Sequence, residues 1–261
     1  MAGKQLEDRV AIVTGAGRGI GRAVSLAFAK EGATIAAVAR TESELKSLEQ
    51  EIQQLGGKVI NISSDLSDRS APAKVVEQVV RELGTVDILV NNAGIGSVAC
   101  LKPLLEFDDN VWDYTLALNL TSPYFFCKAI LPVFLKKHYG RIINIASLAS
   151  KTGLLNGVAY SASKHGLLGL TKTLALEVAK EGVTVNAICP GPVRSKMNEI
   201  RTRYDAERLG LKQEEYEKRM TPIGRRLVPE EIAPMAVLLA SEGAATITGQ
   251  AINIDGGAVM I

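Results

Sequence analysis

The chain has 261 residues, of which 47% are hydrophobic and 22% charged, and its 30 Lys and Arg nearly balance its 28 Asp and Glu. This length fits a single α/β domain over residues 1–261. The near-neutral charge gives no reason to expect a nucleic acid or an anionic membrane as partner. No apolar run approaches the roughly 18 residues of a membrane span, so we expect a soluble, cytoplasmic protein.

Short β-branched runs alternate with longer helical patterns along the chain. The expected strands are 10–14, 34–39, 59–63, 88–91, 141–146, 184–188 and 251–254. The expected helices are 21–31, 42–55, 71–83, 111–135, with an interruption or kink at Pro123 and Pro132, and 159–180. This alternation predicts βαβ units in a single-domain, Rossmann-type, doubly wound α/β fold: seven parallel strands with helices on both faces.

The first strand runs directly into a glycine-rich turn, Thr14-Gly15-Ala16-Gly17-Arg18-Gly19-Ile20-Gly21, and a helix follows. Glycines permit a tight turn and allow backbone N–H groups to approach a pyrophosphate at the positive end of the helix. A glycine-rich turn alone is weak evidence, but here the flanking strand and helix agree with the mechanism. The turn therefore predicts a dinucleotide site.

The second strand ends in Ala39-Arg40 and not in an acid. An acid there would bind a ribose 2′-hydroxyl and repel a 2′-phosphate, whereas the guanidinium of Arg40, with help from Arg18, can pair with that phosphate. We therefore predict NADP(H) as cofactor; the alternative is a surface arginine and an enzyme that accepts either nicotinamide cofactor.

Two further strand ends carry polar residues. Asp65, after the third strand, could accept from an adenine amino group or could cap the next helix. Asn91-Asn92-Ala93-Gly94 closes the fourth strand, where its amides and glycine could line a cofactor cleft or simply form a turn.

Tyr160 and Lys164 are four residues apart at the start of a predicted helix, so they share one helical face. A nearby cation favours a phenolate and brings its proton exchange into a useful pH range. Ser147 ends the strand 141–146, where its hydroxyl could hold a substrate oxygen beside the phenol. The three cysteines, Cys100, Cys127 and Cys189, are far apart and no His lies at metal spacing, so we expect reduced thiols and no metal site.

Taken together, these motifs resemble those of the classical short-chain dehydrogenase/reductase family. The resemblance rests on Thr14-Gly15-x-x-x-Gly19-x-Gly21, Asn91-Asn92-Ala93-Gly94, Asn119, Ser147, Tyr160-x-x-x-Lys164 and Pro190-Gly191. It implies that Tyr160 is the general acid/base, that Ser147 positions the substrate oxygen, that Lys164 lowers the tyrosine pKa and binds the nicotinamide ribose, and that Asn119 holds a water. The implied cofactor-binding residues are Gly15, Arg18, Gly19, Ile20, Gly21, Arg40, Asp65, Leu66, Asn92, Ala93, Gly94, Tyr160, Lys164, Pro190, Gly191, Val193 and Ser195.

The resemblance implies reduction of a ketone or 3-oxoacyl group to a secondary alcohol, as in 3-oxoacyl reductases and polyketide ketoreductases. The alternatives are a sugar or secondary-alcohol dehydrogenase and, more remotely, a non-catalytic nucleotide-binding protein. The substrate is a small carbonyl or alcohol, or an acyl thioester, although Glu181 has the wrong sign for docking an acidic carrier protein. Residues 194–226 predict a substrate lid, or else a solvated helix pair on the rim. Family relatives also imply a homotetramer or homodimer.

Overall fold

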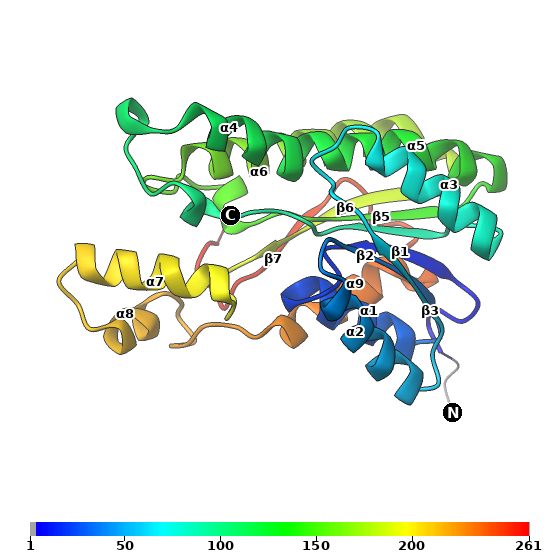
Figure 1. The fold of residues 1–261 in the computed structure, drawn as a ribbon, viewed down its shortest axis with the longest axis horizontal. Helices are drawn as coiled ribbons and strands as arrows, with labels where there is room; N and C mark the ends of the chain where they lie inside the picture. The colour runs from blue at the N-terminus through cyan, green and yellow to red at the C-terminus, as the bar shows by residue number, and fades with distance from the viewer. Residues whose placement is uncertain (1–3, 261) are drawn as a thin grey trace.

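The computed structural model describes residues 4–260, which form a three-layer α/β structure around a seven-stranded parallel sheet (Figure 1). The strand order is β3-β2-β1-β4-β5-β6-β7, which reverses direction at β1 and β4, as expected of a doubly wound sheet. The strands are β1 (Val10–Thr14), β2 (Thr34–Ala39), β3 (Val59–Ser63), β4 (Ile88–Asn91), β5 (Gly140–Ile145), β6 (Val183–Pro190) and β7 (Ala251–Ile254).

Helices cover both faces of the sheet (Figure 1). One face carries α1 (Gly19–Lys30), α2 (Glu42–Gln54) and α9 (Ala233–Ala240), and the other carries α3 (Ala71–Leu83), α4 (Asp109–Leu116), α5 (Ser122–Lys137) and α6 (Val158–Val178). Each face buries its own apolar cluster against the sheet. Burial on both faces explains why the strands are continuous apolar runs with no alternation, and the predicted fold class is confirmed.

The helical stretch Asp109–Lys137 differs from the sequence prediction in two ways. It is long and apolar enough to cross a membrane by length and composition, so the expectation that no such run exists was wrong. It nevertheless packs against α3 and α6, and 44% of its most apolar window is buried, as in a core helix. The prolines do not break it: a π-helical turn at Ala117–Thr121 precedes Pro123, and Pro132 lies inside α5.

The segment after β6 folds into two further helices, α7 (Lys196–Arg208) and α8 (Gln213–Arg219). They stand apart from the two helical layers, at the end of the sheet where β6 finishes (Figure 1). Parallel α/β sheets bind their ligands outside the carboxyl ends of the strands. The chain thus places these helices where a substrate cover is needed.

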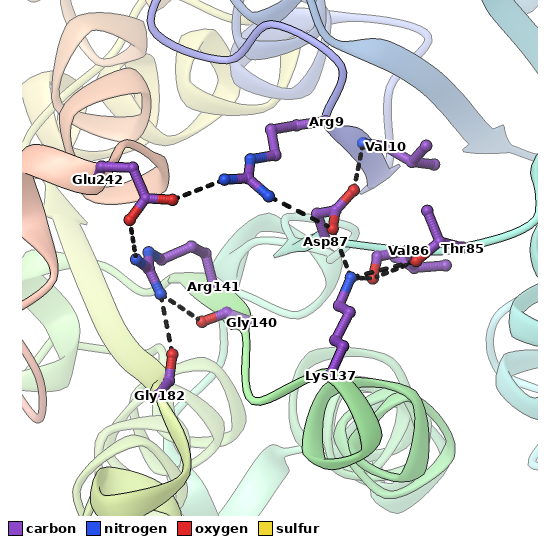
Figure 2. A network of polar contacts seen from close by, with 10 residues as sticks. All are labelled: Arg9, Val10, Thr85, Val86, Asp87, Lys137, Gly140, Arg141, Gly182 and Glu242. Atoms are coloured by element: carbon purple, nitrogen blue, oxygen red, sulfur yellow. Dashed lines mark hydrogen bonds and ion pairs between the residues drawn. The ribbon is translucent and has the colours of Figure 1, made fainter.

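A network of charged residues joins the elements at the opposite end of the sheet (Figure 2). The nearly buried Asp87 accepts a hydrogen bond from the backbone N–H of Val10 at 2.8 Å, pairs with Lys137 and lies 3.9 Å from Arg9. Glu242 accepts from Arg9 at 2.6 Å and pairs with the buried Arg141 at 3.3 Å. The carboxylates therefore hold three cations together and tie β1, β4 and β5 to α5.

Replacement of Asp87 by Ala should destabilise the fold strongly. The change removes the carboxylate that accepts from the Val10 N–H and pairs with Lys137, and it leaves the ammonium of Lys137 close to other cations. Loss of one member of a buried pair typically costs about 3–5 kcal/mol. Urea unfolding followed by circular dichroism would measure this. Glu106→Gln is the control, because its ion pair with Lys102 is exposed and should contribute under about 1 kcal/mol. Equal unfolding midpoints for the two variants would contradict the structural role of Asp87.

Candidate active site

A cavity of about 930 Å³ opens at the carboxyl ends of the strands and runs from the glycine-rich turn to the lid helices α7 and α8. Most of the predicted site residues line it. These are Gly15, Arg18, Gly19, Ile20, Arg40, Leu66, Asn92, Ala93, Gly94, Ser147, Tyr160, Lys164, Pro190, Gly191, Val193 and Ser195. Gly21, Asp65 and Asn119 are not part of its wall.

Some glycines of the glycine-rich turn are required by their backbone conformation, and Gly21 is required because a side chain there has no room. Gly15 and Gly19 have φ values of +65° and +56°, which L side chains rarely adopt, and the Cβ position of Gly19 faces open space. Gly21 was predicted to bind the cofactor, but a Cβ there would lie 2.3 Å from the carbonyl oxygen of Gly15. Gly21 is therefore required for packing of α1 against the turn, and Gly19 leaves room for a ligand.

Thr14 and Asn92 fasten the ends of β1 and β4 together beneath the turn. The Thr14 hydroxyl accepts from the backbone N–H groups of Asn92 and Ala93 at 2.9 and 3.0 Å, and the Asn92 amide donates to the Thr14 carbonyl at 2.9 Å. The preceding Asn91 is buried and donates to Asn144 at 2.9 Å. Of the two amides expected in the cleft, Asn92 lies at its wall and Asn91 holds the sheet together.

At the end of β2, the exposed Arg40 donates to the Tyr114 hydroxyl at 2.9 Å. Arg18 lies 3.8 Å from the carboxylate of Glu44, which also lines the cavity. Sequence reasoning missed Tyr114 and Glu44, because both come from helices whose register against the strand ends depends on the fold. The two arginines provide positive charge at this end of the cavity, and Tyr114 fixes the direction of one of them.

Asp65 does not cap the next helix, and its contact with an adenine amino group stays a prediction. Its carboxylate accepts from the backbone N–H and the hydroxyl of Ser67 at 3.0 and 2.9 Å, and these bonds hold the pKa of Asp65 below its usual value. Helix α3 starts only at Ala71, so Asp65 does not cap it. Instead it closes the turn that places Leu66 against the cavity.

Tyr160 and Ser147 meet in the cavity as the sequence predicted. Tyr160 is in the first turn of α6, and Ser147 follows β5 with its oxygen accepting from the Ala149 N–H at 3.1 Å. Burial raises the pKa of Tyr160, and the hydrogen bond from Ser147 partly opposes this effect. The phenol is therefore protonated at neutral pH, which is the form that donates a proton.

Lys164 lies one helical turn further along α6 and also reaches the cavity. Its ammonium donates to the Ile145 carbonyl at 2.8 Å and lies 5.9 Å from the centre of the Tyr160 ring. Burial lowers the pKa of Lys164 to about 8. The protein thus keeps a desolvated cation close to the phenol, held by the end of β5.

Asn119 is fully buried behind the cavity wall, in the π-helical turn between α4 and α5. Its side chain accepts from the N–H of Ile95 and donates to the carbonyl of Ile95, both at 2.9 Å, and it also donates to Ser163 at 3.2 Å. Asn119 therefore bridges the loop after β4 to α6, one residue before Lys164. The water that the family resemblance assigns to Asn119 stays a prediction.

The end of β6 supplies the wall on the other side. Gly191 has no room for a side chain, because a Cβ there would lie 2.7 Å from the Cα of Asp255. Val193 bridges to Leu227, and the Ser195 hydroxyl caps α7 by accepting from the Asn198 N–H at 3.1 Å. The wall therefore passes directly into the lid.

The lid helices contribute residues that sequence reasoning missed. Arg201, Asp205 and Tyr216 line the cavity, and Arg201 and Asp205 are only 7% and 5% exposed. The i, i+4 spacing of arginine and aspartate was visible in the sequence, but it is also typical of solvated helices. Among residues 4–260, no group of three or more His, Cys, Asp or Glu side chains is arranged to hold a metal ion.

The cavity fits a nicotinamide dinucleotide. The open glycine turn at the start of α1, the cations near the end of β2 and the Tyr160–Lys164 pair lie along one continuous space. A pyrophosphate would lie at the N-terminus of α1, an adenosine near Arg40 and a nicotinamide between Tyr160 and Gly191.

The chain belongs to the short-chain dehydrogenase/reductase family. Residues 9–205 match the family described as short chain dehydrogenase. It is 38% identical over 256 residues to the 3-oxoacyl-[acyl-carrier-protein] reductase FabG of Thermotoga maritima, covering 98% of this chain and 100% of that protein.

Other relatives carry different activities in their names. A protein of Streptomyces violaceoruber named as a candidate ketoacyl reductase of the granaticin polyketide synthase is 41% identical over 95% of this chain and 92% of its own. A crystal structure of a candidate NAD(P)-dependent gluconate 5-dehydrogenase from Beutenbergia cavernae, with NADP at low occupancy, aligns with a TM-score of 0.89 at 38% identity, covering 98% and 99% of the two chains. The family assignment and the fold agree, while the named substrates differ.

Proposed function

We propose that this protein is an NADP(H)-dependent oxidoreductase that interconverts a ketone and a secondary alcohol, with reduction as its main direction. The observation that carries the proposal is the convergence of Ser147, Tyr160 and Lys164 in one cavity with an open glycine-rich turn. A protein that only binds a dinucleotide would have no need of an acid beside a buried cation in the cleft.

The reaction follows from where these groups lie. A nicotinamide cofactor bound in this cavity would supply the hydride that the carbonyl carbon accepts. Ser147 and Tyr160 hold the carbonyl oxygen by hydrogen bonds, and Tyr160 donates its proton as negative charge develops on that oxygen. Lys164 then stabilises the resulting phenolate electrostatically and would hold the cofactor ribose. Asn119 fixes the helix position from which Lys164 acts.

An NADPH-oxidation screen against ketones, 3-oxoacyl thioesters, quinones and keto sugars tests the proposed function. We expect turnover of at least one ketone with NADPH. Absence of turnover with both NADPH and NADH across the whole panel, by a protein that binds NADPH in a fluorescence titration, would refute it and favour a non-catalytic nucleotide-binding protein.

Arg40 should determine the choice of cofactor. Arg40→Asp replaces a cation that can pair with the 2′-phosphate by an anion that repels it, and charged hydrogen bonds of this kind correspond to about 10- to 100-fold in affinity. We expect the ratio of kcat/KM for NADPH to that for NADH to fall by at least that factor. Lys46→Asp, which makes the same charge change at an exposed site on α2, is the control. A wild-type preference for NADH would contradict the assignment.

The substrate has two candidate classes. The names of the relatives suggest 3-oxoacyl groups or a sugar acid. Docking of an acidic carrier protein is disfavoured by Glu181, which pairs with His138 at 3.2 Å on the surface. The second candidate function, a dehydrogenase of a sugar or other secondary alcohol, is favoured by the charged groups of the lid that face the cavity.

The domain organisation, the cellular location and the partners of the protein are also proposals. We propose one functional domain over residues 1–261, a cytoplasmic location, and a homotetramer or homodimer with no nucleic acid or membrane partner. Exposed Tyr124 and Leu135 on α5 and Leu176 on α6 support contact between subunits through these long helices.

A further inference from the structure

The lid carries a buried ion pair that faces the substrate end of the cavity. On α7, Arg201 donates to both carboxylate oxygens of Asp205, at 2.6 and 3.0 Å, and a further N–H donates to the carbonyl of Leu155 at 2.9 Å. Both side chains are less than a tenth exposed, yet both line the cavity. The pair therefore lies at the inner surface of the lid and not in solvent.

The pair retains capacity to bind a ligand. A guanidinium has five N–H groups, and the three hydrogen bonds above leave two of them for other acceptors. The other contacts of Asp205 are long, 3.4 Å from the Tyr216 hydroxyl and 3.6 Å from Arg208. A ligand could replace them at little cost.

The charges of the pair favour hydroxyl groups over both simple anions and acyl chains. Arg201 and Asp205 cancel each other, so the pair does not attract a carboxylate as a lone arginine would. A hydroxyl group can donate to the carboxylate and accept from the guanidinium at the same time. An acyl chain would cover both charges without replacing the water that hydrates them, which is unfavourable.

We propose that Arg201 and Asp205 select a polyhydroxylated substrate, a keto sugar, keto-sugar acid or the corresponding polyol, for the Tyr160 centre. This inference rests on the proposed function and specifies its substrate class. Tyr216 from α8 completes the subsite as an additional hydroxyl partner. The lid thus provides specificity, and the residues at the ends of β5 and α6 provide the chemistry.

Pairs of ketones that differ only in hydroxylation test the proposal: 5-keto-D-gluconate against 5-oxohexanoate, and L-erythrulose against 2-butanone. With NADPH, we expect kcat/KM of the wild type to be at least about 10-fold higher for the hydroxylated member of one pair. If the unhydroxylated ketones or acetoacetyl-coenzyme A are reduced equally well or better, the inference is wrong while the proposed function stands. If no ketone in the wider screen is reduced, the proposed function itself fails.

The double variant Arg201→Met/Asp205→Leu separates recognition from structure. Apolar residues of similar size often replace a buried ion pair without loss of stability, so this variant should fold, which thermal melting would verify. We expect its kcat/KM ratio between hydroxylated and unhydroxylated ketones to fall about 10- to 100-fold. A purely structural pair would instead lower both values by the same factor and leave the ratio unchanged.

Arg219→Met is the matched control. Arg219 forms an i, i+4 ion pair with Glu215 on α8 at 2.5 Å, but both side chains are about half exposed or more and neither lines the cavity. The kcat/KM values of Arg219→Met for the hydroxylated and the unhydroxylated ketone, and the ratio of the two, should stay at the wild-type values. A change in ratio equal to that of the double variant would show that any loss of lid charge has this effect, and would overturn the proposal.

Discussion

Tyr160→Phe is expected to lower kcat for ketone reduction by about 10²- to 10⁴-fold, because it removes one hydroxyl group that donates the proton. The aromatic ring remains and continues to fill its partly buried site on α6. The affinity for NADPH, measured by fluorescence titration, should therefore change little. Steady-state kinetics with a saturating ketone would give the ratio of kcat values.

Tyr204→Phe provides a control for this result. This variant also removes a phenolic hydroxyl, the one that accepts from the Asn156 amide at 2.6 Å. The Tyr204 side chain does not line the cavity. Its kcat should stay within a few-fold of the wild-type value. Near-normal turnover by Tyr160→Phe would contradict the assigned proton donor, and equal losses in both variants would point to a general effect of losing a phenol.

Lys164→Met should abolish most activity and at the same time stabilise the protein. The ammonium that stabilises the phenolate is lost, so kcat/KM should fall about 10²-fold or more. Burial lowers the pKa of Lys164 to about 8 from an ordinary value of 10.5, which means that its charged form is unfavourable in the fold. Methionine removes that cost, and we expect a gain of about 1 to 3 kcal/mol in the free energy of unfolding at pH 7.

The pH dependence checks the cause of this gain. Between pH 8 and 10.5 the unfolded chain holds a proton on Lys164 that the folded protein has lost. The free energy of unfolding of the wild type should therefore gain a rising contribution across this window, and Lys164→Met should lack it. Denaturant unfolding at several pH values measures this difference. Lys172→Met, at an exposed position of the same helix, should keep the wild-type slope.

Deprotonation of Lys164 at high pH, which raises the free energy of unfolding, should lower the activity. The kcat/KM value reports ionisations of the free enzyme, and the protonated form of Lys164 is the one that stabilises a phenolate. We therefore expect kcat/KM for reduction to be constant below pH 8 and to fall above it. A profile that rises through pH 8 would contradict this role. Activity thus depends on a lysine that lowers the stability of the folded protein.

The sheet, the glycine-rich turn and the Tyr160–Lys164 face could be predicted because each depends on local patterns. Strands buried on both faces appear as short apolar runs, and five of the seven had the predicted bounds. The i, i+4 spacing places two side chains on one helical face whatever surrounds the helix. Most of the predicted cofactor residues line the cavity, because strand ends in this fold meet at one edge.

Other features of the site depend on packing that the sequence does not show. Gly21 and Asn91 belong to the right motifs, but whether they face the cavity or the core depends on which atoms pack behind them. The bridge that Asn119 makes was not visible either, since its partner Ile95 lies 24 residues away. Such contacts join segments that the sequence does not show to be neighbours.

By itself, the sequence determined the fold, the glycine-rich turn and the placing of Tyr160 and Lys164 on one helical face, since periodicity and short spacings express them directly. Only the tertiary structure decided that Arg201 and Asp205 face the cavity instead of solvent. The sequence spacing of an i, i+4 ion pair is the same whether the pair faces a cavity or the solvent. What differs is the surface against which α7 packs, and that surface is formed by α8, the short helical turn at Ser97–Ala99 and the loop at Leu155 together.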